Sequence, residues 1–112
     1  MEDFALYKKL KAMAASPVPS REKELARDVL EIADTVMEIL NIAKDKRPLV
    51  VDVLLMHMAF VGRFGEEPPC PDPKTKEAIQ TMAILFVGEC FKRKVEFPSE
   101  EAFEDVQFSN MN

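Results

Sequence analysis

The sequence predicts an all-α fold: a four-helix bundle-like domain with a short fifth helix near the C-terminus. Apolar residues recur at helical spacing in four long segments. The chain has only three glycines, and its eight prolines fall between these segments or at their first positions. With 112 residues, 47% hydrophobic and 31% charged, the chain is long enough for one core and reads as a single globular domain over residues 1–112.

Residues 48–64 form the segment that the other helices are expected to cover. At about 100° per residue, apolar side chains occupy nearly the whole circumference of this helix. Only a narrow strip containing Asp52 and Arg63 is polar, so the helix should be buried. Pro48 suits its first position, and the glycines at 62 and 65 suit its end. The apolar run is shorter than the roughly 20 residues of a membrane span, so we expect no membrane role.

Two helices are expected before this segment. The first covers residues 3–15 and ends at a stiff break, Ser-Pro-Val-Pro. Ser20 is a suitable N-cap for the second helix, which we expect to extend to about Lys44. Its apolar residues alternate steps of four and three along a heptad-like seam: Leu25, Val29, Ile32, Val36, Ile39 and Ala43.

A fourth helix and a short fifth one are expected after it. Asp72 is a suitable N-cap, Pro73 suits the first position, and the helix should continue to about Lys94. Ser99 can cap the fifth helix, which would lie in a loosely docked tail at residues 98–112. A helix this short is marginal in water and must dock on something. We expect it to dock on its own domain, or on a partner, through Phe103 and Phe108.

The charge distribution argues against nucleic-acid binding. The net charge is −5, and the last fourteen residues hold four acids and no base. The remaining body is close to neutral and offers no basic field for a phosphate backbone. Cys70 and Cys90 lack metal-ligand or CxxC spacing. With no export pattern at the start of the chain, we expect two reduced thiols and a cytoplasmic location.

His57 and Glu89 are the candidate binding residues within the helices. His57 is the only histidine and lies in the apolar arc of the central helix. Such a residue acts as a ligand or general base, or more commonly as a neutral core histidine. Glu89 falls within an apolar arc, where a carboxylate is costly unless paired. It either pairs with a base, for which Arg63 is a candidate, or lines an interface or a small-molecule pocket near His57.

The second helix carries an acidic stripe on which a metal ion could bind, through Glu31, Asp34 and Glu38. The Glu31-x-x-Asp34 pair resembles half of the acidic pattern with which helical Mg²⁺-dependent nucleotide pyrophosphohydrolases hold metal. The second pair is missing, because only Glu101 and Glu104 in the tail repeat the spacing. A single stripe binds a metal weakly. We therefore expect no metal and no cofactor, and interpret the stripe as a solvated helix face.

The sequence contains no catalytic constellation and no phosphate loop. The central, second and fourth helices each carry apolar arcs of half the circumference or more, which four helices shield incompletely. We therefore expect a non-enzymatic interaction protein: a regulatory, adaptor or inhibitor subunit that binds a protein partner through helical surfaces and forms a homodimer. The alternatives are a Mg²⁺-dependent hydrolase of the kind just described and a small-molecule-binding protein.

Overall fold

The computed structural model describes residues 4–95, and within them the chain is mostly helical. It contains four α-helices and one 3₁₀ turn: α1 (Ala5–Ala14), α2 (Arg21–Ile39), η1 (Lys44–Lys46), α3 (Arg47–Phe64) and α4 (Pro73–Arg93). This confirms the all-α prediction. The predicted fifth helix and both tail phenylalanines, Phe103 and Phe108, lie outside the described residues. None of the described helices is long and apolar enough to cross a membrane.

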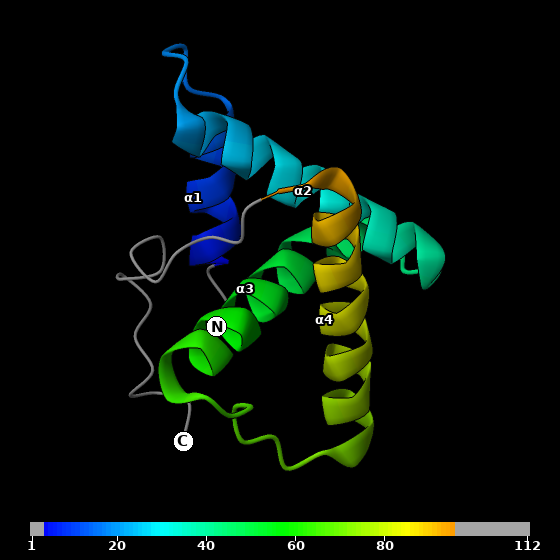
Figure 1. Cartoon of the computed structure of the whole chain (residues 1–112). Coiled ribbons are helices and arrows are strands. Elements are labelled where there is room, and N and C mark those ends of the chain that lie inside the picture. The colour runs from blue at the N-terminus through cyan, green and yellow to red at the C-terminus, as the bar shows by residue number, and fades with distance from the viewer. Residues whose placement is uncertain (1–3, 96–112) are drawn as a thin grey trace.

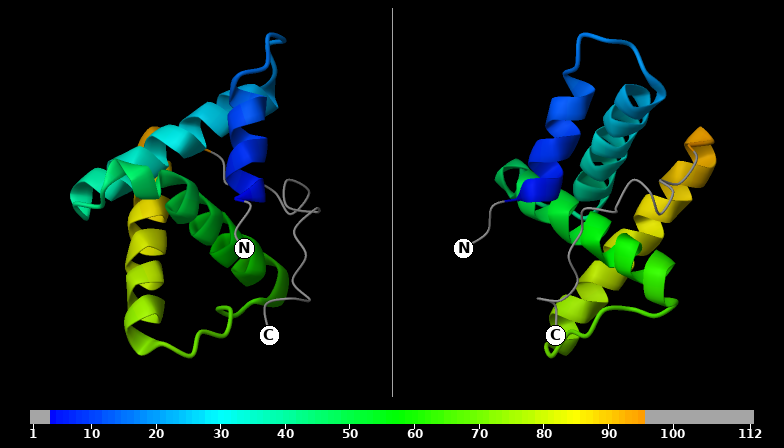
Figure 2. Two further views of the ribbon diagram at one scale, coloured as in Figure 1. Left: turned by 180° about the vertical axis from the view of Figure 1, so that it is seen from behind. Right: turned by 90° about the vertical axis from the view of Figure 1, so that its left-hand side faces the viewer.

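The helices pack around α2, which crosses the others at one end of the molecule. Figure 1 shows the start of α3 and the end of α4 meeting under α2, and the two helices then diverge toward the loop at residues 65–72. The reverse view shows α3, α4 and the loop that joins them as the sides of an open triangle, and α2 lies across the corner where the two helices meet (Figure 2). Helix α1 folds back beside α2 and also contacts α3. The space between α3 and α4 is thus closed by the loop and by side chains rather than by a further described helix.

The core lies where α2, α3 and α4 meet. Six large side chains there are less than 2% exposed: Val29, Ile32, Val36, Val51, Leu54 and Phe86. Three of them belong to the predicted seam of α2, so this part of the pattern is confirmed. The end of the predicted seam is wrong, because Ile39 is 55% exposed and Ala43 is exposed and lies beyond the helix. The predicted burial of α3 is also confirmed along most of its length, from Val50 to Phe60.

Helix α2 begins as predicted but ends about five residues earlier. The Ser20 hydroxyl accepts a hydrogen bond from the Lys23 N–H at 3.1 Å, which is the expected N-cap. At the other end, Asn41 adopts the left-handed conformation with φ 55°. The N–H of Ile42 then bonds to the carbonyl of Met37 at 2.9 Å, which closes the helix in a Schellman turn. Asparagine tolerates this conformation, and it stops the helix before Lys44.

Asp52 holds α1 against α3. The residue before α1, Phe4, has a left-handed backbone and supplies no side-chain cap. Instead, Oδ1 of Asp52 accepts a hydrogen bond from the N–H of Tyr7 at 2.8 Å, in the first turn of α1. A carboxylate at a helix N-terminus satisfies a free N–H and interacts favourably with the helix dipole. The polar strip of α3 therefore has a structural role: it caps a neighbouring helix.

Helix α4 begins at Pro73, directly after Asp72, but the Asp72 side chain makes no capping hydrogen bond of the predicted kind to a backbone N–H. The Thr75 hydroxyl donates to the Asp72 carboxylate, and this bond holds the pKa of Asp72 below its ordinary value, together with the N–H groups of Lys74 and Thr75. The carboxylate thus stays charged at the positive end of the helix. Gly65 ends α3 with φ 72°, a backbone conformation that glycine adopts without strain.

Candidate functional site

The most unusual surface of the described chain is the outer face of α4, made by Thr81, Ile84, Gly88 and Phe91. Ile84 is 71% exposed and Phe91 is 80% exposed, the highest values among the exposed large hydrophobic residues. Seven residues separate them, which is nearly two full helical turns, so both point to the same side. A large exposed aromatic beside a large exposed aliphatic residue is typical of a binding surface rather than of scattered surface residues.

Gly88 lies between these two residues, and the described structure does not require a glycine there. A Cβ atom placed on Gly88 would meet no atom within 4 Å. The residue has no positive φ that glycine alone would tolerate. Glycine inside a helix costs about 1 kcal/mol relative to alanine. The outer face of α4 therefore carries no side chain at its centre, so the backbone of another helix could approach closely there.

A shallow hollow continues this surface toward the end of α2. Its volume is about 430 Å³, and it opens widely to solvent. Thr81 belongs both to the outer face of α4 and to the rim of the hollow. The floor and walls come from α4 and from the residues that follow α2: Leu40, Ile42, Lys74, Glu77, Ala78, Thr81 and Met82. A mainly apolar surface therefore extends from Phe91 along α4 to the hollow.

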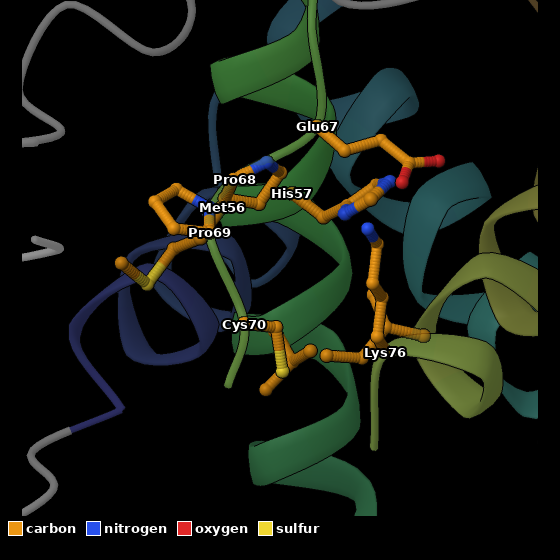
Figure 3. A pocket seen from close by; sticks show the side chains of 9 residues that line it. Met56, His57, Glu67, Pro68, Pro69, Cys70 and Lys76 are labelled. Carbon is orange, nitrogen blue, oxygen red and sulfur yellow. The ribbon is translucent and has the colours of Figure 1, made fainter. Parts of the chain in front are cut away.

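A second cavity, of about 200 Å³, lies between α3, α4 and the loop that joins them. Val53, Met56 and Ile79 give it an apolar floor, and Pro68 and Pro69 form one wall. Its polar groups are gathered around His57. Figure 3 shows the imidazole of His57 between the Glu67 carboxylate and the Lys76 ammonium group.

The electrostatics around His57 favour its neutral form. Burial lowers the pKa of the imidazole, and the nearby Glu67 carboxylate raises it by a smaller amount. The same carboxylate accepts a hydrogen bond from Nε2 of Gln80 at 2.6 Å, which fixes the loop against α4. His57 is therefore a neutral, mainly buried histidine at the rim of a small cavity.

This arrangement predicts a specific loss of stability in acid. The pKa of His57 in the folded chain lies below the ordinary value of 6.5, so the unfolded chain binds a proton more readily. The stability that the fold gains from a neutral His57 is fully present above pH 6.5. It is lost as the pH falls through the pKa of His57 in the folded chain. Urea midpoints at pH 7.5 and 5.5 should differ more for the wild type than for His57→Gln. Equal differences for the two proteins would contradict the assignment.

Glu89, the other predicted binding residue, does not line this cavity. It is half-buried on α4, one turn before Arg93. The structure brings His57 together with Glu67 and Lys76 instead. Glu67 lies in the loop between α3 and α4, where no periodic pattern in the sequence marks it. Glu67 comes close to His57 because the loop after α3 turns back across that helix, which the sequence does not show.

The acidic stripe of α2 is engaged by arginines from two other helices. Asp34 faces Arg47 of α3, with Nε 2.9 Å from Oδ1 and Nη2 donating to Oδ2 at 3.0 Å. Glu31 lies 3.4 Å from Nη1 of Arg93 in α4, whose Nη2 donates to Thr35 at 3.0 Å. Glu38 is exposed. Across residues 4–95, no group of three or more acidic, histidine or cysteine side chains is placed to hold a metal ion.

Comparison of the chain with protein-family models, with curated proteins and with solved structures finds no match in any of the three. The described chain offers two candidate binding surfaces: the outer face of α4 with its hollow, and the small cavity beside His57.

Proposed function

We propose that this chain is a non-enzymatic interaction protein, a regulatory, adaptor or inhibitor subunit that binds through the outer face of α4. The observation that carries the proposal is the exposure of Ile84 and Phe91 on either side of Gly88. Covering apolar surface contributes about 25 cal/mol per Å², and aromatic side chains are common anchors of interfaces. We place this role in the reducing cytoplasm, where the free thiols of Cys70 and Cys90 stay reduced.

The partner that we propose first is a second copy of the chain. In a two-fold dimer the same patch lies on both sides, and each contact occurs twice. An antiparallel pairing of two α4 helices, centred between Ile84 and Gly88, keeps the basic ends at Lys92 and Lys94 apart. It also brings the first turns of α4, with the exposed Glu77, Lys74 and Lys76, toward the basic end of the other copy, so the charges there are mixed. A parallel pairing would place like charges together, which is unfavourable.

Crosslinking from position 88 tests this proposal. The starting protein carries Cys70→Ser; its remaining thiol, Cys90, is buried, and burial raises its pKa, so it reacts slowly. Gly88→Cys in this background should give a covalent dimer with a short bis-maleimide at micromolar concentration. The space around Gly88 accommodates the new side chain.

The matched control places the cysteine at Val18, which is 65% exposed in the turn between α1 and α2. This control should give no covalent dimer under the same conditions. No dimer from Gly88→Cys, or equal yields from both positions, would contradict a second copy on the outer face of α4.

The cavity beside His57 supports a second candidate function, binding of a small molecule. A volume of about 200 Å³ with an apolar floor, an acid, a base and an imidazole suits a small amphipathic compound. Native mass spectrometry of the freshly purified chain should then show a bound species that His57→Leu loses. A mass equal to the bare chain in every preparation would remove this candidate.

The hydrolase alternative is the weakest of the three. A metal bound at the α2 stripe would have to compete with Arg47 for Asp34 and with Arg93 for Glu31. Titration with Mg²⁺ or Mn²⁺ to millimolar concentration checks it through the amide spectrum. Shifts confined to residues around Glu31, Asp34 and Glu38 would support the hydrolase function. An unchanged spectrum would contradict it.

A further inference from the structure

We infer that the cavity beside His57 binds a small monocarboxylic acid whose apolar body is about the size of one benzene ring, with the carboxylate held by Lys76 and His57. This inference rests on the second candidate function, binding of a small molecule, because it names the class of that ligand. It is independent of the proposed dimer, since none of the residues that line the cavity belongs to the outer face of α4.

The imidazole of His57 shows that the cavity suits a ligand with a polar group. The side chain is only 8% exposed, and it lines the cavity. No residue of the described chain forms a hydrogen bond with its ring nitrogens. A neutral imidazole has one N–H donor and one acceptor, and burying such groups without a partner is costly. A ligand with a polar group beside His57 would remove this cost.

The charged groups around the imidazole favour an anion over a cation. The Glu67 carboxylate already accepts a hydrogen bond from Nε2 of Gln80 at 2.6 Å. Lys76 extends from α4 toward the imidazole (Figure 3), and it makes no ion pair with any residue between 4 and 95. The ammonium group of Lys76 and an imidazole N–H therefore remain as donors at the cavity. Charge-assisted hydrogen bonds from two such donors suit the two oxygens of a carboxylate.

The balance of charge limits the ligand to a single negative group. Lys76 supplies one positive charge, and Glu67 would repel a second anionic group of the ligand. A phosphate ester or a dicarboxylic acid would thus carry a charge that no described residue of the cavity neutralises. Glu67 is exposed, so solvent screens its repulsion of one carboxylate. The cavity therefore favours a monocarboxylate.

The remaining walls of the cavity set the size and polarity of the ligand body. Val53, Met56 and Ile79 form the floor, and Pro68 and Pro69 form one wall. The volume of about 200 Å³ is somewhat larger than the roughly 150 Å³ of an apolar cavity that holds one benzene molecule. A six-membered ring, or a branched chain of similar size, fits this space together with one carboxylate.

Titration with phenylacetate tests the inference. Because this ligand has only about ten non-hydrogen atoms, we expect a dissociation constant on the order of 1 mM. His57 is the only histidine of the chain, so the C–H signals of its imidazole give one unambiguous readout by NMR. These signals should shift and saturate as phenylacetate is added at millimolar concentration. Phenylacetamide, which has nearly the same shape and no charge, should bind about tenfold more weakly.

Matched variants at exposed positions separate the two charges. Lys76→Met keeps the length of the side chain and removes its charge, so phenylacetate should bind about tenfold more weakly. Glu67→Gln removes the repelling charge and should tighten binding about threefold. Lys74→Met makes the same change outside the cavity and should leave the affinity unchanged. Because all three side chains are exposed, each variant should keep the wild-type amide spectrum.

The opposite dependence on charge would overturn the inference. Phenethylamine carries the same ring with a positive group, and tighter binding of this amine than of phenylacetate would show that the cavity selects cations. The inference would also fail if phenylacetate caused no saturable shift of the His57 signals, or if Lys76→Met bound it as tightly as the wild type.

These outcomes are separable from those of the two proposed functions. If phenylacetate does not bind while native mass spectrometry still shows a species that His57→Leu loses, the cavity binds a small molecule of another class and our assignment of the ligand is wrong. Crosslinking from Gly88→Cys reports only on the outer face of α4, so its result depends on neither experiment.

Discussion

Phe86→Ala should lower the free energy of unfolding by about 3–5 kcal/mol, the usual cost of removing a buried phenylalanine. Phe86 is 1% exposed and packs between α4 and the helices α2 and α3. The change removes apolar contacts and leaves a cavity in a close-packed region. Urea denaturation followed by circular dichroism gives the measurement.

The matched control is Phe91→Ala, in the same helix and with the same change in side chain. Phe91 is on the opposite, exposed side of α4, so this variant should lose less than about 1 kcal/mol. The comparison tests the assignment of the two faces directly. Equal losses at the two positions would show that the outer face of α4 is part of the core, and the binding proposal would fail.

Leu54→Ala and Leu55→Ala should each cost about 2–5 kcal/mol, because both leucines are buried although they point about 100° apart on α3. Burial of both is expected only for a helix that is covered on several sides. Ile84→Ala is the control, with an exposed aliphatic residue and little expected change. If both leucine variants keep the wild-type midpoint, the central position of α3 is wrong.

The sequence predicts the beginnings of the helices better than their ends. Ser20, Pro48 and Asp72 mark positions where a cap or a fixed φ is needed, and these chemical requirements are local. The predicted end of α2 at about Lys44 is wrong, because Ile42 and Ala43 continue the apolar pattern beyond the true end at Ile39. The left-handed turn at Asn41 decides the end instead. Asparagine tolerates a left-handed turn but does not require one. It therefore marks the end of a helix less clearly than a proline marks a helix start.

The exposed face of α4 could not be predicted from periodicity. Apolar residues surround nearly the whole helix in its second half, so the pattern does not say which of Phe86 and Phe91 is buried. The crossing of α4 under α2 decides it, and that angle depends on contacts far apart in the sequence. Gly88 lies between the exposed Ile84 and Phe91 on this face.

The polar contacts between helices were also beyond the sequence. The sequence shows Asp52 as a polar residue within an apolar helix, but it does not show that the carboxylate accepts from a backbone N–H 45 residues away. The arginines that meet the acidic stripe come from α3 and α4, 13 and 62 residues from their partners. Both ion pairs are substantially exposed, so each contributes little to stability. They connect α2 to the first residue of α3 and to the last residue of α4.

Sedimentation equilibrium is the most direct test of the central claim, that the outer face of α4 is an association surface. The wild type at micromolar concentration should show a mass that rises with concentration above the 12.7 kDa of one chain. Phe91→Glu should stay at 12.7 kDa throughout, and Val18→Glu, an exposed apolar residue changed in the same way, should behave as the wild type. A wild type that remains a single species of 12.7 kDa, or a Phe91→Glu variant that associates as strongly as the wild type, would contradict the account.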